Sequence, residues 1–471
     1  MQKEGESMEL EERLVRFLVD TRYEDIPQET IETMKRSVID TFGVLCAGSS
    51  APDIAELLLH LKARNPAEEA SVAVFGDRVS VTDAAWINGA MIRSREFDDS
   101  DDHAGDHSST PVFSSGMATA ELLGTVSGKE FLAAYALATE FNIRLRMAPR
   151  TRVGAPSQGF AANSYAPFSA AIIAGRLMKL NAEQMYNALG WAYAQMAGAV
   201  QVQQCGSSVL QIQHGMAASH GVNAALLARA GFAGIEHFLT GKFGLYNAYV
   251  GGNYDPEVIE KDLGKRYYAT DIGTKPYPCG RIIQAPIEAA LVLRETIGSI
   301  DEIESLRIRY TKGGVNMTCQ PEARHFPDSF QHAKFSLYYG VAAALVYGKV
   351  TVAEYSEEAI RNPEIRRIIE KITVIPDESL GQEMPPGLIE ARLKDGRTVN
   401  VERRLSKGTA ARPYTMEEII EKLRSCLPYS ARPLAEERVE AAIARLEDFE
   451  NEENIADLMR LFTAQEKGEK E

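Results

Sequence analysis

The sequence predicts a mainly α-helical protein with a smaller α/β domain inserted between two helical parts. From Asp83 to about Ala230 the chain is rich in alanine and glycine and has the pattern of long, closely packed helices. Strand-like alternation then appears beside helical stretches. After Gly408 charged amphipathic helices return, so we expect the two chain ends to build one helical domain. The predicted limits are 1–268 for its first part, 269–405 for the α/β domain and 406–471 for its second part.

Length, charge and cysteine usage restrict the class of protein. A chain of 471 residues that is 45% hydrophobic predicts two domains, since single cores stop growing at roughly 250–300 residues. The net charge of −15 argues against a nucleic-acid partner, which needs a basic face. Five scattered cysteines without a CxxC pair suit a reducing compartment. The first residues are too acidic for a targeting peptide and no apolar run could span a bilayer, so we expect a cytoplasmic protein without a membrane partner.

The first elements are helices. Leu10 to Val19 has apolar residues at helical spacing, and a second helix with an apolar face runs from Ile31 to Leu45 after Pro27. Residues 71–75, SVAVF, fit either a short strand or a turn between helices. Ser127 and Asn181 stand where helix N-caps belong. The long helices are predicted at 83–93, 113–124, 128–145, 166–179, 182–200 and 214–230.

The α/β part begins with a turn at 273–281, GTKPYPCGR, that leads into a helix. IESLRIRYT alternates as a strand does, and residues 388–405 form a hairpin around Asp395-Gly396, a dipeptide suited to a tight turn. A helix cap is expected at Thr415. The other predicted elements are helices at 285–297 and 328–347 and a strand at 372–375.

The stretch from Arg93 to Ser115 is the main candidate site. Such acidic runs are usually solvated. Here apolar, small-residue helices flank the run, so it cannot lie far from the core, and its mixture of carboxylates, imidazoles and arginines pushes pKa values apart. Its ionisable residues include Glu96, Asp98, Asp99, Asp101, Asp102, His103, Asp106 and His107.

Two chemistries are open for this stretch. Carboxylates with imidazoles suit Mn, Fe or Zn, although neither HExxH spacing nor EF-hand order occurs. The metal donors would be Asp98, Asp99, Asp102, His103 and His107. The alternative is metal-free acid–base work, in which His107 or His103 exchanges a proton and Ser100 helps fix the substrate. No GxGxxG after a strand, P-loop or GxSxG elbow points to another cofactor or nucleophile.

Cationic residues follow in the α/β part. Lys275 and Arg281 flank the Pro-Gly turn, and Arg281 opens a helix whose N-terminus favours an anion. A further polar set in AKFSLYYG comprises Lys334, Ser336, Tyr338 and Tyr339, whose tyrosines also suit a buried, hydrogen-bonded pair. A carboxylated substrate between two domains would need these cations.

The segment NGAMIRSREFDDS resembles the NGALAHALDFDDT block of the MmgE/PrpD family, which includes 2-methylcitrate dehydratases, cis-aconitate decarboxylases and iminodisuccinate epimerases. The similarity continues in order through IPQETIETMKRSVIDTFGVLCAG, AELLGTVSGKEFLAAYALATEFNIRLR, HGMAASHGVNAALLARAGFAG, KPYPCGRIIQAPIEAAL, AKFSLYYGVAAALVYGKV and LKDGRTV. The resemblance implies a helical domain, an inserted α/β lid, a homodimer and an active site in the cleft. It also implies catalysis without metal or organic cofactor, by proton transfer next to a carboxylate.

The resemblance implies site residues position by position. The acid that opens DFDDT falls on Glu96, its threonine on Ser100, and the following histidine on His107 with one residue inserted. The lysine of KPYP falls on Lys275 and the tyrosine of the FSxPY segment on Tyr339. These five form the expected catalytic set. The expected substrate-binding set is Arg93, Asp99, His103, Arg281 and Gln284.

Four family residues are replaced. Arg93 stands for a histidine before DFDDT, Ala161 for a second histidine, Leu210 or Gln211 for a lysine, and Gln284 for the histidine after KPYPCC. The expected function is a cofactor-independent, dehydratase-like lyase that acts on a small polycarboxylate. The alternatives are an epimerase or isomerase, which only removes and returns a proton, and a catalytically silent relative that binds a metabolite or partner.

Overall fold

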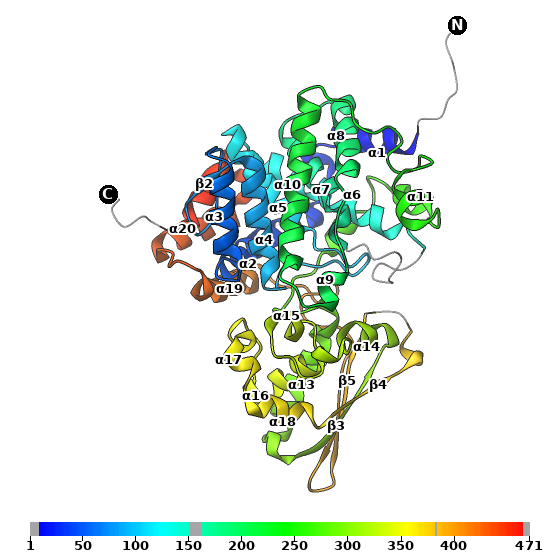
Figure 1. Ribbon diagram of the computed structural model, residues 1–471, viewed down its shortest axis with the longest axis vertical. Helices are drawn as coiled ribbons and strands as arrows, with labels where there is room; N and C mark the ends of the chain where they lie inside the picture. Colours follow the sequence, from blue (N-terminus) through cyan, green and yellow to red (C-terminus); the bar gives the residue numbers. More distant parts are fainter. Residues whose placement is uncertain (1–8, 151–161, 382–383, 465–471) are drawn as a thin grey trace.

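The computed structural model describes residues 9–150, 162–381 and 384–464. Helices dominate it, and a four-stranded sheet forms between residues 303 and 403, so the predicted fold class is confirmed. Two hydrophobic cores form, one from residues near both chain ends and one from residues 279–401. Figure 1 shows the helical part above the α/β part. None of the helices in these ranges combines the length and the apolar character that crossing a membrane requires.

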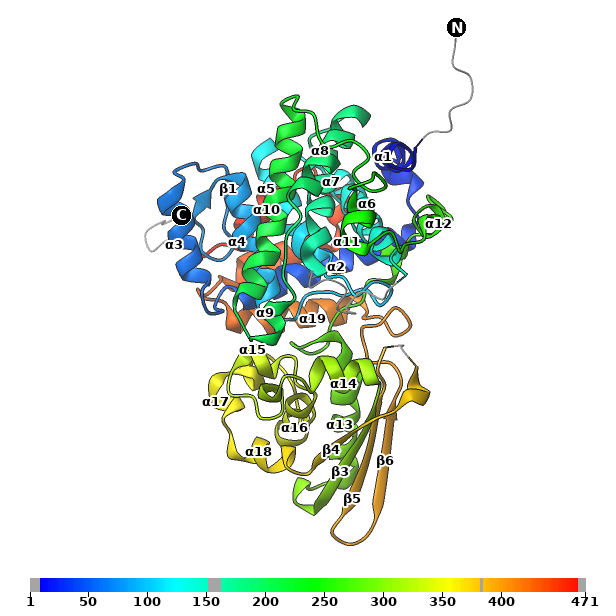
Figure 2. The ribbon, with the colours of Figure 1, turned by 45° about the vertical axis from the view of Figure 1, so that its right-hand side comes forward.

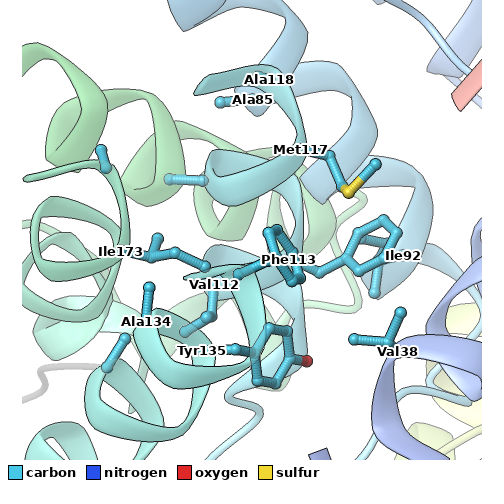
Figure 3. Packing of buried hydrophobic residues seen from close by; sticks show 14 of the residues in the cluster. Val38, Ala85, Ile92, Val112, Phe113, Met117, Ala118, Ala134, Tyr135 and Ile173 are labelled. Atoms are coloured by element: carbon cyan, nitrogen blue, oxygen red, sulfur yellow. The ribbon is translucent and has the colours of Figure 1, made fainter. Parts of the chain in front are cut away.

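The first core unites the ends of the chain. The Phe42 ring lies edge-on to Phe113 at 4.8 Å and stacks on Phe462 at 4.3 Å. Figure 3 shows Phe113 among Val38, Ile92 and Tyr135. The helices of this part are α1 (Leu10–Asp20), α2 (Gln28–Gly48), α3 (Ile54–Arg64), α4 (Val81–Ser94), α5 (Ser109–Leu123), α6 (Gly128–Met147), α7 (Ala166–Leu177), α8 (Ala182–Ala194), α9 (Gln201–Gln204), α10 (Val209–Arg229), α11 (Leu245–Val250), α12 (Pro256–Glu260), α19 (Met416–Cys426), α20 (Glu436–Glu447) and α21 (Ala456–Leu461).

Helices α4 and α10 approach each other closely because glycines face the contact. A Cβ on Gly215 would lie 2.1 Å from the Trp86 carbonyl oxygen, and one on Gly89 would lie 3.0 Å from the Gly215 Cα. This approach brings the end of α4, which carries Arg93, near the part of α10 that carries His214.

The second core covers one face of the sheet. The strand order is β4-β3-β5-β6, with β3 and β4 parallel and the other pairs antiparallel. In β3, Leu306 lies between the buried residues Ile372 and Ala391, which matches the predicted alternation. Helix α13 packs on β5 and β6, with α16 and α18 beyond it (Figure 2). The elements are α13 (Gln284–Ile297), β3 (Ile303–Tyr310), α14 (Lys312–Thr318), α15 (Phe330–Ala333), α16 (Leu337–Tyr347), α17 (Glu357–Ile360), α18 (Pro363–Ile369), β4 (Ile372–Pro376), β5 (Gly387–Leu393) and β6 (Thr398–Arg403).

Several predicted helices differ from the structure, and those expected at 113–124 and 214–230 begin earlier, at Ser109 and Val209. The helix expected at 182–200 ends at Ala194, before Gly198 with its φ of +146°. The helix expected at 328–347 is divided, because the Ser336 hydroxyl accepts from the Tyr339 amide at 3.0 Å and begins a new helix. Of the two alternatives for 71–75, the turn holds for most of the segment, and Ala70–Ser71 (β1) pairs with Arg78–Val79 (β2). The caps at Ser127, Asn181 and Thr415 are confirmed.

Two chain crossings join the parts. Gly273 exchanges backbone hydrogen bonds of 2.9 and 3.0 Å with Ser100 of the helical part. Gly408, in the returning crossing, has a φ of +81°, and a Cβ there would lie 1.8 Å from the Thr274 carbonyl oxygen. Glycine is therefore required where the crossings touch. The domain limits at 269 and 405 stay a prediction.

Candidate active site

Glu96 lies at the centre of a buried charge cluster. It follows the end of α4 and has a φ of +53°, a left-handed conformation that is uncommon outside glycine. Arg93 Nη1 lies 2.7 Å from Glu96 Oε2. Lys275 Nζ reaches from the turn that opens the α/β part and donates to Glu96 Oε1 and to its backbone oxygen, both at 3.0 Å. The strained loop therefore presents one carboxylate to cations from two parts of the molecule.

Asp98 is the second carboxylate of the cluster. Its Oδ1 accepts from Arg93 Nη1 at 3.1 Å and lies 3.6 Å from Lys275 Nζ. Burial opposes ionisation of both acids, but the neighbouring cations, Arg93 foremost, outweigh it and hold the pKa of Glu96 and of Asp98 below their usual range. Two carboxylates thus stay ionised among paired cations.

The imidazole of His107 has a defined orientation. Its Nδ1 lies 2.8 Å from the Asp99 carbonyl oxygen and 3.3 Å from Asp98 Oδ2, and both atoms can only accept. Nδ1 therefore carries the proton, an assignment made from the hydrogen-bond network. Nε2 lies 3.4 Å from Arg93 Nη2 and 3.9 Å from Glu96 Oε1. The lone pair of a neutral His107 is thus on the Nε2 that faces the cluster.

The loop before α5 positions His107. Asp99 accepts from the Ser109 amide at 3.1 Å and from its hydroxyl at 2.7 Å, at the start of that helix. Asp101 accepts from the backbone amides of His103 and Asp106 at 2.9 and 2.7 Å. These acids build the loop from within, which explains why an acidic run lies buried.

His214 is a second imidazole beside the cluster. Its ring centroid lies 6.3 Å from that of His107, and its Nδ1 donates to the Leu210 carbonyl oxygen at 2.8 Å. Burial, with a smaller effect from Arg93, lowers the pKa of His214 to about 3, so this ring is neutral at physiological pH. Sequence reasoning did not single it out, although it begins the HGMAASHG block.

Lys334 approaches the same centre from the α/β part. Its Nζ is buried, lies 4.0 Å from Glu96 Oε2 and has no hydrogen-bond partner among the described residues. The rings of Phe330 and Phe335 lie 5.0 and 5.5 Å away. Burial lowers the pKa of Lys334 to about 7. The sequence placed Lys334 among the cations that a carboxylated substrate between two domains would need.

Comparison with known proteins agrees with this architecture. Residues 12–257 match the MmgE/PrpD N-terminal domain and residues 277–448 the MmgE/PrpD C-terminal domain. The chain belongs to the MmgE/PrpD family. The cis-aconitate decarboxylase-like protein oryM of Aspergillus oryzae is 26% identical in an alignment 482 residues long, gaps included, that covers 96% of this chain and 97% of that protein.

Other relatives carry related names. The cis-aconitate decarboxylase of Homo sapiens is 26% identical over 452 residues, which cover 93% of this chain and 91% of that protein. The 2-methylcitrate dehydratase of Cupriavidus necator is 25% identical over 397 residues, 77% of each chain. At this coarse level, the relatives support a lyase of the dehydratase or decarboxylase type.

The remaining expected site residues of this MmgE/PrpD protein have protein partners. His103 Nε2 lies 2.7 Å from Asp271 Oδ2, and that hydrogen bond raises the pKa of His103. Arg281 donates to both carboxylate oxygens of Asp102 at 2.8 Å. The Ser100 hydroxyl lies 3.5 Å from the Asp101 carbonyl oxygen. Of these contacts, the pair between Arg281 and Asp102 joins the two parts of the molecule.

Gln284 and Tyr339 lie in the α/β part. The Gln284 amide donates to the carbonyl oxygens of Tyr277 and Cys279 at 3.0 and 2.9 Å and so braces the turn that carries Lys275. The buried Tyr339 hydroxyl donates to the Glu354 carbonyl oxygen. Arg93, Glu96, Asp99, His107 and Lys275 therefore form or adjoin the cluster, whereas Gln284 and Tyr339 support structure nearby.

The replaced family positions have distinct surroundings. Arg93 lies inside the cluster and contacts both acids. Leu210 and Gln211 are buried on α10, and the Leu210 carbonyl holds His214. Ala161 lies outside the described residues.

The cluster contains residue types that can bind a metal ion. Of the predicted donors, Asp102 pairs with Arg281 and His103 with Asp271. Ligand atoms of Glu96, Asp98 and His107 do lie within 4.8 Å of one another. Arg93 and Lys275, however, already neutralise these two carboxylates and would repel a divalent cation at the same oxygens. The charge distribution does not fit a metal ion.

Proposed function

We propose that this protein is a cofactor-independent lyase that acts on a small polycarboxylate by acid–base elimination. The observation that supports the proposal is the imidazole of His107, whose Nδ1–H is held by two acceptors while Nε2 faces a buried group of cations. A base of this kind can remove a proton from the carbon next to a carboxylate. The cations lower the energy of the negative charge that develops.

A substrate that carries carboxylates fits the buried donors of the cluster that have no hydrogen-bond partner in the part of the chain that the structure describes. Arg93 and Lys275 are both buried and both contact Glu96 and Asp98. Arg93 Nε is buried and makes no hydrogen bond within the described residues. A substrate carboxylate would satisfy such donors. Arg93 also adds a cation at the position where the family block that this sequence resembles has a histidine. We assign Arg93 and Lys275 to substrate binding, with Lys275 beside the reacting carbon.

The carboxylates support the proton transfer. When His107 takes a proton at Nε2, Asp98 near Nδ1 and Glu96 at 3.9 Å from Nε2 stabilise the imidazolium. The electrons of the broken C–H bond then form the double bond as a β-hydroxyl leaves. Substrate contacts of Ser100, Tyr339, Asp99, His103, Arg281 and Gln284 stay predictions.

Decarboxylation is the second candidate reaction. The comparisons that cover most of both chains include proteins named cis-aconitate decarboxylases. Loss of carbon dioxide also leaves a carbanion, which the same cations would stabilise and a protonated His107 would quench. We further propose a cytoplasmic homodimer, which light scattering and cell fractionation would test.

A substrate screen tests the function. Thermal shift would first identify which di- and tricarboxylates bind, and 2-methylcitrate, citrate and cis-aconitate would then be assayed for alkene absorbance and carbon dioxide release. We expect His107→Gln to lower kcat by about 10²- to 10⁴-fold without loss of folding, because it removes the base. His60→Gln, on the exposed side of α3, is the matched control.

Each outcome of the screen has a clear meaning. Alkene formation supports elimination, and carbon dioxide release supports the second candidate. Deuterium uptake from heavy water into recovered substrate, without either product, would replace both by an epimerase. Absence of binding, turnover and exchange for every acid would overturn the enzyme proposal in favour of a silent relative.

A further inference from the structure

We propose that Lys334 is a catalytic residue of this site, the acid that protonates the leaving hydroxyl while His107 takes the proton from carbon. This inference rests on the proposed lyase function and adds the second group that an elimination needs. A single base can remove the proton from carbon, but hydroxide is a poor leaving group unless a general acid protonates it.

The positions of the two groups suit this division of work. Glu96 lies between them: His107 Nε2 is 3.9 Å from its Oε1, and Lys334 Nζ is 4.0 Å from its Oε2. The two proton-transfer atoms therefore approach opposite oxygens of one carboxylate. They also come from different parts of the molecule, so a substrate between the parts would meet one on each side.

Lys334 differs from the other buried lysines of the chain. Among the described residues, buried Lys35 and Lys275 donate to Glu450 and Glu96, both at 3.0 Å. Lys422 lies 2.7 Å from Asp40 and donates to the Phe97 carbonyl oxygen at 3.1 Å. Lys334 Nζ is as buried but makes no hydrogen bond to any described residue. A buried ammonium without a hydrogen-bond acceptor is costly, and a structural role does not explain why this one is kept.

The surroundings of Lys334 keep its proton easy to release. Complete burial opposes the charged form and is the main reason that the pKa of Lys334 falls to about 7. The faces of Phe330 and Phe335 partly offset this effect, because they attract the ammonium. Glu96 acts in the opposite sense and is the largest effect that retains the proton. The other charged groups that face Nζ are Arg93, Lys275 and Asp98.

A backbone hydrogen bond fixes Lys334 beside the turn at 273–281. Its carbonyl oxygen accepts from the Gly280 amide at 2.8 Å, which ties it to the turn that carries Lys275. The Ser336 cap begins α16 two residues later, so Lys334 lies in the break between α15 and α16. This break, which divides the expected helix, aims the side chain at Glu96.

The proposed step is balanced. The Cα–H bond breaks, its proton goes to His107 Nε2, and its electrons form the C=C bond. The Cβ–O bond breaks, and a proton from the Lys334 ammonium joins the leaving oxygen to give water. The substrate becomes an alkene plus water, while His107 ends as imidazolium and Lys334 as neutral amine. Exchange with solvent after product release restores both.

The variant Lys334→Met tests the two proton transfers separately, because elimination and deuterium exchange at carbon are measured in the same reaction. In heavy water with a substrate that the wild type converts, we expect elimination to fall by about 10²- to 10⁴-fold while deuterium exchange at carbon stays within about tenfold. His107→Gln should lose both. Lys334→Arg keeps the charge but not a releasable proton, and it should show the same division. Lys312→Met, an exposed lysine of the same α/β part, is the control.

Two independent readings accompany this test. The wild-type rate should fall as pH rises above about 7, since the ammonium is the active form, and Lys334→Met should lack that limb. Without any substrate, the ¹³Cε signal assigned to Lys334 by its absence from Lys334→Met should titrate near pH 7. Titration above pH 9 would contradict the assignment.

The failures are distinguishable. Lys334→Met elimination within about tenfold of the wild type, or equal losses of elimination and exchange in both Lys334 variants, would overturn the role of Lys334 and leave the lyase function intact. A wild-type protein that neither eliminates nor exchanges with any acid would overturn the proposed function itself. If Lys334→Met does not fold, Lys334→Arg provides the same comparison.

Discussion

The pKa values of single carboxyl groups in the cluster depend on whether the nearest charge is positive or negative. Glu96 and Asp98 stay ionised because Arg93 stabilises their negative charge. For Asp99, the next residue in the chain, the two largest effects on the pKa are burial and the negative charge of Asp98. Both effects raise the pKa of Asp99, to about 8. Adjacent carboxyls therefore have opposite protonation at neutral pH, as groups with different tasks in a site often do.

Asp99→Asn should make the stability of the protein less dependent on pH. In the wild type the unfolded carboxyl ionises near pH 4, but the folded one only near pH 8, so the stabilisation is complete below about pH 4 and is lost as pH rises to 8. Asparagine does not ionise, so the variant should gain stability relative to wild type across that window. Urea unfolding at pH 5 to 9 measures it. For the exposed Asp457→Asn, the plot of unfolding free energy against pH should run parallel to that of the wild type. A parallel plot for Asp99→Asn would contradict the prediction.

The cluster could be predicted in part at this scale. The acidic stretch and the family resemblance identified Arg93, Glu96, His107 and Lys275, and the structure brings them together. The places of His214 and Lys334 beside the cluster were not predictable from spacing. His214 lies more than 100 residues from His107 in the sequence, and only the close approach of α4 and α10 makes them neighbours.

Helix caps and tight turns, which depend on a few neighbouring residues, were predicted correctly from the sequence. The capping boxes at Ser127, Asn181 and Thr415 and the Asp395-Gly396 hairpin formed where the sequence placed them. The break at Ser336 was missed, because an apolar run favours one helix and the competing cap is a single hydroxyl. The end of α8 at Ala194 was missed for a similar reason, because the alanine-rich sequence that follows also favours a helix.

Gly215→Ala should destabilise the helical part by about 1–3 kcal/mol, because the new methyl would overlap the Trp86 carbonyl oxygen and force α4 and α10 apart. Denaturant unfolding measures the change, and a loss of turnover should accompany it as Arg93 and His214 move. Gly313→Ala, on α14 with open space around its Cβ, is the control and should be neutral or slightly stabilising. Equal midpoints for both variants would show that the helices adjust freely.

For the whole molecule, the charge cluster is itself part of the contact between the two parts. Lys275 and Lys334 reach Glu96 from the α/β part, and the bidentate pair between Arg281 and Asp102 is a further contact between the parts. Separation of the parts would break each of these contacts together. Access of substrate to the cluster is therefore linked to the contact between the two parts.

Arg281→Met should loosen that contact. It removes two charge-assisted hydrogen bonds to Asp102 and one to Ser406, and hydrogen bonds to charged groups contribute roughly 1.5–3 kcal/mol each. Amide hydrogen exchange of Ser100 and Gly273, which bond each other across the crossing, should accelerate about tenfold or more. Arg307→Met, in an exposed pair on the sheet, should leave both amides unchanged. Unchanged exchange in Arg281→Met would show that the crossing is held by other contacts.

The stacking of Phe42 on Phe462 has a consequence during synthesis on the ribosome. Helix α2 emerges early, but the ring that covers it and the helix α19 that packs beside it are translated only after the entire α/β part. The nascent chain therefore exposes an apolar face for most of its elongation, a state that favours aggregation and chaperone binding. The α/β part, whose core is contiguous in sequence, can fold before the helical part that precedes it.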